Sequence, residues 1–307
     1  MWIESALDTE VTLADEQANE ILADKESLSA LQENVENNPI TSRDAFCSYL
    51  KVHGVDKKEF PLSDKEWLGK FLRGFRYYDE VSSVAKDKWI PLDYFFALML
   101  TEGEWNATTI NTADGGVGVL QIMPETFKRF CNELWEKDKT TYAAYHDYKV
   151  FYDQPKYASY KNKNNKAMAD GLLFLKKKNK SDAATLAKID SRFDPKVSLH
   201  FSAEYLLYCK SKVSTDITNE DTRRQYALNG YNKWPNNYDN DFNWSHLTNI
   251  KKRKTVYENF SAQLDACIAQ KKTGAEILEQ LKPAKKILST KTPLEKKSLT
   301  PKKIQKK

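Results

Sequence analysis

A chain of 307 residues is long enough for one large domain or two small ones. Hydrophobic residues make up 40% of it, and its 7 Trp, 16 Tyr and 14 Phe accompany 30% charged residues, which is typical of a globular domain with exposed polar additions. The net charge is +5, the four cysteines lack C-x-x-C spacing, and neither an H-E-x-x-H pattern nor a P-loop occurs, so metal, redox and nucleotide chemistry receive no support and we expect no cofactor.

The chain begins with an acidic N-terminal segment, residues 1–40, which holds many acids, one Lys and few large apolar residues. We predict a mobile segment or a peripheral helix there, outside the core. This terminus lacks the basic and apolar regions of a secretory signal. The sequence also contains no run of about 18 apolar residues that would span a membrane.

Residues 41–87 carry apolar side chains at helical spacing. Phe46 and Tyr49 lie three positions apart, and Trp67 and Phe71 lie four apart. This period is that of a helix that buries one face. The segment is therefore predicted to be a helical lead-in subdomain.

The main domain is predicted to span residues 88–270 and to be mainly α. Strand signals are sparse there, and a small hairpin near 108–120 is the one extended feature expected. Helices are predicted at 91–104, 124–137, 166–178, 194–211, 220–230 and 254–270.

The stretch F-F-A-L-M-L-T-E-G-E-W-N, which begins at Phe95, places a carboxyl group at the end of an apolar helix. Apolar walls and the negative end of a helix dipole both disfavour the ionised form of Glu102, so its pKa is expected to rise toward neutrality. A carboxyl group that keeps its proton can act as a general acid. Gly115, Gly116 and Gly118 follow in a loop where a backbone could approach a ligand closely.

Two later stretches complete the pattern. R-F-D-P-K-V-S-L-H-F-S-A-E-Y-L, residues 192–206, reads as an amphipathic helix with Asp194 as N-cap and Pro195 in the first turn. Y-A-L-N-G-Y-N-K-W-P contains Tyr231 and Asn232, whose hydroxyl and amide groups can form hydrogen bonds.

The chain ends in a segment, residues 271–307, with twelve Lys, three Glu and three Pro. We predict a disordered basic tail. Its charge suits anionic wall polymers or a membrane surface. Nucleic-acid binding is not expected, because no base-stacking motif or recognition helix accompanies the lysines.

Taken together, these stretches resemble one family. E-G-E-W-N followed by G-G-V-G-V-L-Q-I-M-P-E-T is similar to the signature E-S-x-[FW]-N-P then G-A-x-G-L-M-Q-[IL]-M-P-x-T of the soluble lytic transglycosylases. The downstream stretches resemble that family's D-P helix and its A-L-x-A-Y-N-x-G-P segment, in the same order. The resemblance covers about residues 88–262.

The resemblance implies a goose-type-lysozyme-like helical fold and an enzyme, a peptidoglycan lytic transglycosylase. Alignment of the aromatic-Asn pair puts Glu102, rather than Glu104, at the family's catalytic glutamate. As the resemblance implies, this single acid/base protonates the bond between MurNAc and GlcNAc and then closes a 1,6-anhydro ring on MurNAc. The substrate-binding residues that it implies are Gln121, Met123, Tyr231, Asn232 and Gly118.

Peptidoglycan glycan strands are the implied partner, and they lie outside the cytoplasm. The protein is therefore expected at the cell envelope or outside the cell, for example in the periplasm or cell wall. With no signal visible, delivery by a virion or a secretion machine is one route, and a trimmed signal is another.

The chain departs from the family at several positions. Gly103 replaces the usual Ser and so lacks a hydroxyl, Glu104 adds a carboxylate, Phe201 or Ser202 replaces a Gly, and Lys233 begins a K-W-P sequence in place of the small G-P turn.

Two alternatives follow. A lysozyme-type hydrolase would use water and a second acid, for which Asp114 and Glu104 are candidates, although Asp114 beside Gly115 also suits a turn. A structural component would hold peptidoglycan without cutting it.

Overall fold

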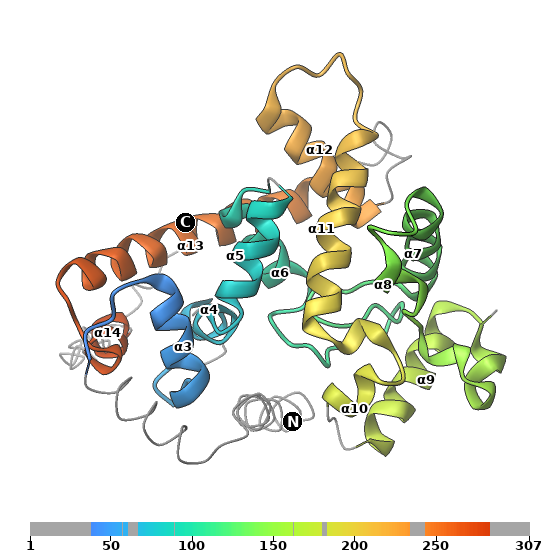
Figure 1. The fold of residues 1–307 in the computed structure, drawn as a ribbon, viewed down its shortest axis with the longest axis horizontal. Coiled ribbons are helices and arrows are strands. Elements are labelled where there is room, and N and C mark those ends of the chain that lie inside the picture. The colour runs from blue at the N-terminus through green and yellow to red at the C-terminus, as the bar shows by residue number, and fades with distance from the viewer. Residues whose placement is uncertain are drawn as a thin grey trace, which may run out of the picture.

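The computed structural model describes residues 38–56, 58–60, 67–88, 90–161, 163–179, 183–233 and 243–282. Within these ranges the regular structure is helical, which confirms the mainly-α prediction (Figure 1). The helices are α3 (Arg43–His53), α4 (Trp67–Phe75), α5 (Tyr78–Asp87), α6 (Leu92–Glu102), α7 (Pro124–Lys137), α8 (Ala143–His146), η1 (Phe151–Asp153), η2 (Pro155–Tyr160), α9 (Asn165–Lys178), α10 (Ala183–Ala187), η3 (Ser191–Phe193), α11 (Pro195–Ser211), α12 (Glu220–Lys233), α13 (Trp244–Ala269) and α14 (Gly274–Leu281).

The expected hairpin near 108–120 is reduced to two isolated antiparallel bridges. Ile110 pairs with Val117, and Val117 pairs with Ile122, without a continuous strand in the described residues. The other large difference is α13, which begins at Trp244, ten residues before the predicted start at 254. Asn243 caps it by accepting the backbone N–H of His246 at 3.0 Å. With this cap, α13 is almost three turns longer at its amino end than the apolar periodicity predicted.

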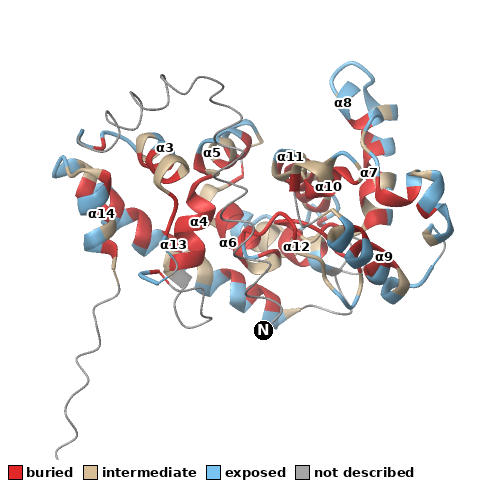
Figure 2. Cartoon of the chain, turned by 90° about the horizontal axis from the view of Figure 1, so that it is seen from below, coloured by how far each residue is buried: buried red, intermediate tan, exposed pale blue. Residues whose placement is uncertain are grey.

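Helix α6 forms the centre of the molecule. Every residue from Tyr94 to Leu100 is buried, because the helix is apolar on all sides and needs neighbours around it (Figure 2). The long helix α13 makes the most extensive contact with it. Rings from both ends of the chain meet here: the Phe75 centroid lies 6.1 Å from that of Phe96 and 5.1 Å from that of Phe260. The lead-in helices and the main region therefore share one core.

Part of the predicted basic tail is folded, so the boundary at residue 271 is wrong. Helix α14 begins with a capping box between Thr273 and Glu276, and it buries Ile277 and Leu281. The backbone N–H of Ile40, the last residue of the predicted acidic segment, donates to the Lys272 carbonyl at 2.8 Å. Residues 1–37 and 283–307 lie outside the described residues, and so do most of the predicted acidic segment and most of the basic tail.

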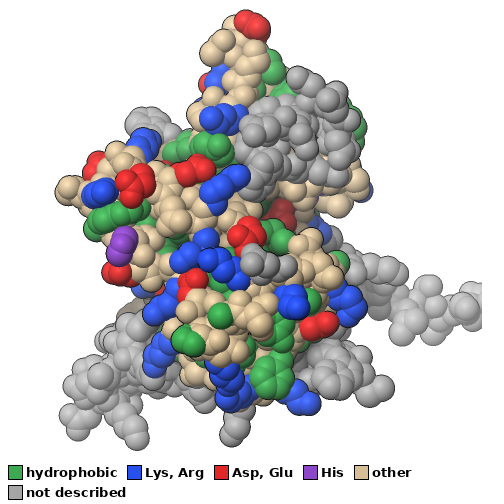
Figure 3. Space-filling view, turned by 90° about the vertical axis from the view of Figure 1, so that its right-hand side faces the viewer, with side chains coloured by type: hydrophobic (Ala, Val, Ile, Leu, Met, Phe, Trp, Pro, Cys, Tyr) green, Lys and Arg blue, Asp and Glu red, His purple; other side chains and the backbone are tan. Residues whose placement is uncertain are grey.

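Helices α7 to α10 form the opposite end of the molecule from α3 and α14 (Figure 1). On this end, seen from outside, acidic and basic side chains are mixed with hydrophobic ones (Figure 3). Leu173 and Phe174 of α9 are exposed there.

In the part of the chain described, no helix is long and apolar enough to cross a membrane, no group of His, Cys, Asp and Glu could hold a metal ion, and the four cysteines are buried and free.

Candidate active site

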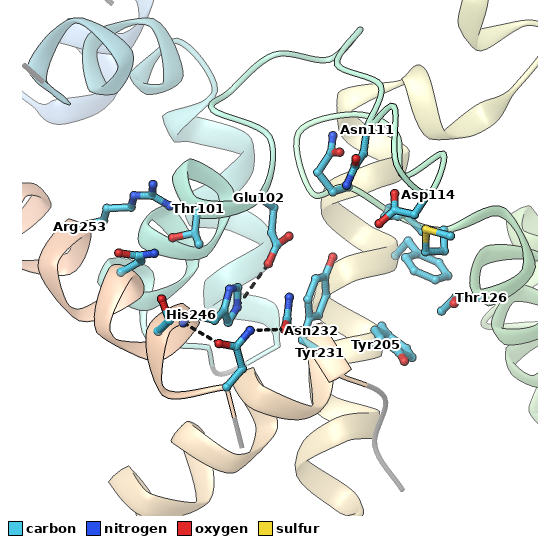
Figure 4. Close-up of a pocket in the computed structure, with 17 residues that line it drawn as sticks. Thr101, Glu102, Asn111, Asp114, Thr126, Tyr205, Tyr231, Asn232, His246 and Arg253 are labelled. Carbon is cyan, nitrogen blue, oxygen red and sulfur yellow. Dashed lines mark hydrogen bonds and ion pairs between the residues drawn. The ribbon is translucent and has the colours of Figure 1, made fainter. Parts of the chain in front are cut away.

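A pocket of about 620 Å³ opens where the end of α6 meets a loop, 103–123, and the helices α11, α12 and α13 (Figure 4). Its lining is mostly polar and consists of Thr101, Glu102, Asn111, Asp114, Gln121, Ile122, Met123, Thr126, Phe201, Tyr205, Tyr231, Asn232, Asn243, Ser245, His246, Asn249 and Arg253. We refer to this hollow as the Glu102 pocket.

Glu102 is the last residue of the apolar helix α6, and its side chain is only 14% exposed. Burial raises its pKa from the ordinary value of 4.5 to about 8, because the ionised form would lose its hydration. Arg253 opposes this rise and Asp114 adds to it. The carboxyl group therefore keeps its proton at neutral pH, as the sequence predicted.

The chain turns sharply after Glu102 through a close contact between two backbones. The N–H of Gly103 donates to the Met99 carbonyl at 3.1 Å and ends the helix. A Cβ at position 103 would lie 2.4 Å from the Gly118 carbonyl oxygen, which is far inside contact distance. A serine, as in the family that the sequence resembles, would not fit here without a backbone shift. The glycine is thus required by the path of the loop.

His246 faces Glu102 from the first turn of α13. Its Nε2 lies 3.4 Å from Glu102 Oε1, and the two side chains point toward one another (Figure 4). Burial, together with the positive charge of Arg253, lowers the pKa of His246 from 6.5 to about 4. At neutral pH the imidazole is therefore uncharged.

Asn243 ties this histidine to α12. It receives the His246 N–H on its side chain, donates its own backbone N–H to the buried Asn229 at 2.9 Å, and donates Nδ2 to Asn232 Oδ1, also at 2.9 Å. The position of His246 is therefore fixed by three hydrogen bonds of one residue.

The loop opposite Glu102 carries Asp114 and Gln121. Asp114 Oδ1 accepts the Gly116 N–H at 2.9 Å, which is the turn role expected for an Asp before glycines, yet the residue also lines the pocket. Gln121 has a left-handed backbone with φ of 49°, and its Nε2 donates to the Gly118 carbonyl at 2.9 Å.

A fully buried ion pair holds the loop 103–123 in place. Asp190 accepts from Arg192 Nε at 2.9 Å and from Arg192 Nη2 at 2.7 Å, and both side chains are inaccessible to solvent. The remaining nitrogen, Nη1, donates to the carbonyls of Gly115 at 3.2 Å and Ile122 at 2.7 Å. The guanidinium thus fixes both ends of the segment that carries Gln121.

The Tyr231 hydroxyl is bound to the loop rather than to the acid. It donates to the Leu120 carbonyl at 3.1 Å and shares a 2.8 Å hydrogen bond with Ser202. Ser202 stands near the position where the resembled family has Gly, so this contact explains that departure. The hydroxyl of Tyr231 is therefore hydrogen-bonded to Leu120 and Ser202, and His246 also approaches Glu102.

The structure brings together five of the six predicted site residues. Glu102, Gln121, Met123, Tyr231 and Asn232 line the pocket. Gly118 does not: its φ of 80° places it against the Arg192 backbone, where an added Cβ would lie 2.5 Å from the carbonyl oxygen.

Of the two candidate second acids, only Asp114 is in the pocket. Glu104 has a left-handed backbone with φ of 51° and pairs with the buried Lys70 at 2.5 Å. Its carboxylate is used in this ion pair.

The sequence did not predict the pocket wall formed by α13, nor the Asp190–Arg192 ion pair that holds the loop. Ser245, Asn249 and Arg253 lie four residues apart along α13 and line the pocket with His246. The signal available was Asn243, a good N-cap residue, before W-S-H-L. Asp190 is a near neighbour of Arg192, but no sequence signal indicated the loop contact, because the carbonyls of Gly115 and Ile122 that Arg192 binds are distant in sequence.

Comparisons of the chain with protein-family models, with curated proteins and with solved structures found no match.

Proposed function

We propose that the protein is a peptidoglycan lytic transglycosylase with Glu102 as its single acid/base. The observation that supports this most directly is the protonated, buried carboxyl group of Glu102 at the edge of a polar pocket that also holds Gln121, Met123, Tyr231 and Asn232. The goose-type-lysozyme-like fold belongs to the same proposal and rests on the sequence resemblance together with the helical architecture.

In the proposed reaction, Glu102 gives its proton to the glycosidic oxygen between MurNAc and GlcNAc. The bond from MurNAc C1 to that oxygen breaks, and the N-acetyl group of the substrate assists. The resulting carboxylate of Glu102 then takes the proton of the MurNAc 6-hydroxyl, while the oxygen of that hydroxyl bonds to C1. The 1,6-anhydro ring closes without water, and Glu102 regains its proton.

A hydrolase is the second candidate, and the presence of Asp114 in the pocket favours it. Water would replace the 6-hydroxyl, and Asp114 would serve as the second acid that ordinary glycosidases use. Glycan strands of the cell envelope are the proposed partner in either case, and a location at the envelope or outside the cell follows from the substrate.

The test is digestion of purified peptidoglycan followed by mass spectrometry of the soluble fragments. The intact protein should release muropeptides lighter by one water than hydrolytic ones, and Glu102→Gln should lower the rate at least about 10³-fold, because a glutamine has no proton to give. Glu104→Gln is the matched control, since it alters a carboxylate that lies two residues away and outside the pocket. It should keep near-normal activity.

Other outcomes would replace the proposal. Hydrated fragments that disappear in Asp114→Asn would establish the hydrolase. Normal activity of Glu102→Gln would remove Glu102 from the chemistry. Retention on insoluble peptidoglycan without any soluble fragment would leave a binding protein.

A further inference from the structure

The carboxyl end of α6 and the amino end of α13 meet at Glu102, and each helix dipole disfavours the charged form of the side chain at that end. Glu102 lies at the carboxyl end of α6, where the partial negative charge of the helix disfavours a carboxylate. His246 is the third residue of α13, where the partial positive charge disfavours an imidazolium. A charge-separated pair would place each charge at the wrong helix end. The pair is therefore two neutral groups.

Two buried polar atoms that form no hydrogen bond face one another. Glu102 Oε1 and His246 Nε2 are both shielded from solvent and both lack a hydrogen-bond partner, yet they lie only 3.4 Å apart, so a small closing movement would pair them. One carboxyl oxygen of Glu102 points at the imidazole and the other at the open pocket (Figure 4). A neutral imidazole carries one N–H, so the assignment depends on where this proton and the carboxyl proton lie.

We propose that His246 donates its Nε2–H to Glu102 Oε1, which leaves the carboxyl proton on Oε2, facing the substrate. This inference rests on the proposed function and adds a second catalytic-site residue to it. His246 stays neutral throughout: it neither gains nor loses a proton. Its role is to direct the acid and to stabilise the carboxylate that remains after Oε2–H has passed to the glycosidic oxygen. The proton from the 6-hydroxyl then returns to Oε2.

The opposite arrangement, with Oε1–H donating to an unprotonated Nε2, would direct the acidic proton away from the substrate. It would also leave the new carboxylate without a donor. A donor to a charge that develops during the reaction usually contributes about 10²–10³-fold in kcat. The other charged or titratable groups around the pair are Arg253 on α13, Asp114 on the loop and Tyr231 on α12. Arg253 favours a neutral imidazole because it repels a second positive charge.

The first test is kinetic and uses two replacements. His246→Leu should lower kcat about 10²-fold and change KM less than about threefold, because the lost hydrogen bond strengthens only as charge develops. His246→Gln should stay within about tenfold of the intact protein, since its amide can donate in the same place.

The pH profile separates this role from a merely structural one. Activity of the intact protein should fall as pH rises through about 8, where Glu102 ionises. In His246→Leu this alkaline limb should move up by about one unit, because the carboxylate loses a donor and gains apolar surroundings. A limb that stays in place or moves down would overturn the proposal, as would equal losses in the Leu and Gln variants.

The second test does not depend on any glycan being cut. The chain has four histidines, so nitrogen NMR of histidine-labelled protein resolves His246 as the signal absent from His246→Gln. We expect a neutral ring protonated at Nε2 from about pH 5 to about pH 7.5, and a shift change near pH 8 that Glu102→Gln abolishes. A ring protonated at Nδ1, or one that titrates at the ordinary value, would refute the pairing. Failure of the digestion alone, with the NMR result as expected, would refute only the proposed function.

Discussion

Glu102 shows how one side chain obtains an unusual chemistry from its position. The end of a fully apolar helix supplies both the low-polarity surroundings and the unfavourable dipole, and the left-handed backbones of Glu104 and Trp105 turn the chain away immediately afterwards. The cost is that the folded state disfavours the ionised form of this carboxyl group. Stability and activity are therefore linked through this residue.

The linkage gives a stability prediction with a definite sign. The pKa of Glu102 is raised in the folded protein to about 8, so between about pH 4.5 and pH 8 the unfolded chain releases a proton that the folded protein keeps. The contribution of Glu102 is therefore fully present at low pH and is lost as pH rises, by about 1.4 kcal/mol per unit.

Glu102→Gln should remove this loss. In urea denaturation, the variant and the intact protein should differ little at pH 5, the variant should become progressively more stable up to about pH 8, and the difference should level off above that pH. The difference between the two proteins cancels the contributions of groups that both share. Parallel stability curves across this range would show that Glu102 titrates normally.

At the scale of elements, the loop between α6 and α7 depends on a residue far along the chain. The glycines at 103 and 118 allow two backbones to touch, and Arg192 binds the carbonyls on either side of the Gln121 turn. Because Asp190 satisfies the rest of this guanidinium, the charge is buried without being unpaired. The shape of the pocket wall follows from this one cluster.

Arg192→Lys tests this anchor. A lysine lacks the fork that reaches Asp190 and two carbonyls together, so the free energy of unfolding should fall by about 3–5 kcal/mol. Arg43→Lys is the matched control: Arg43 forms a similar two-bond pair with Asp265 at the surface, with distances of 2.8 and 2.6 Å, and should cost at most about 1 kcal/mol. Equal losses in both variants would mean that the buried pair has no special role.

At the scale of the whole molecule, the two ends of the described chain close one core. Tyr49 of α3 packs on Gly274 of α14, Phe71 of α4 stacks on Phe260 of α13, and Phe75 of α4 meets the same ring edge to face. Helix α14 takes up the first part of the basic tail expected from composition, and residues 283–307, which follow the described residues in the sequence, hold nine Lys and one Glu.

This boundary defines a pair of truncations. Removal of residues 283–307 should weaken binding to walls that carry anionic polymers, strongly at about 10 mM salt and little at about 150 mM, where the charges are screened. The rate at which this truncated protein cleaves a neutral soluble glycan should not change. Removal of residues 271–307 also deletes the buried Ile277 and Leu281 and should cost about 3 kcal/mol or more of stability. Unchanged wall binding by the shorter truncation at both salt concentrations would rule out the electrostatic role.

The sequence by itself determined the features that depend on near neighbours. Apolar periodicity located α7, α9 and α11 within one residue of their observed starts, and Asp194 caps α11 as predicted. The apolar run before Glu102 also predicted the raised pKa of its carboxyl group, because burial and a helix end are both local consequences of that run. Five residues predicted from the family resemblance line one pocket, although their convergence from α6, the loop and α12 depends on the packing of those elements.

Only the tertiary structure decided which distant groups meet. His246 is 144 positions from Glu102, and Arg192 is 70 from Ile122, so no periodicity or spacing connects either pair. The same holds for Glu104, which the turn directs to Lys70, and for Tyr231, whose hydroxyl binds Leu120 rather than the acid. A hydrogen bond depends on the positions of two atoms to within a few tenths of an ångström. Those positions are set by the packing of α6, α12 and α13, which a single element cannot specify.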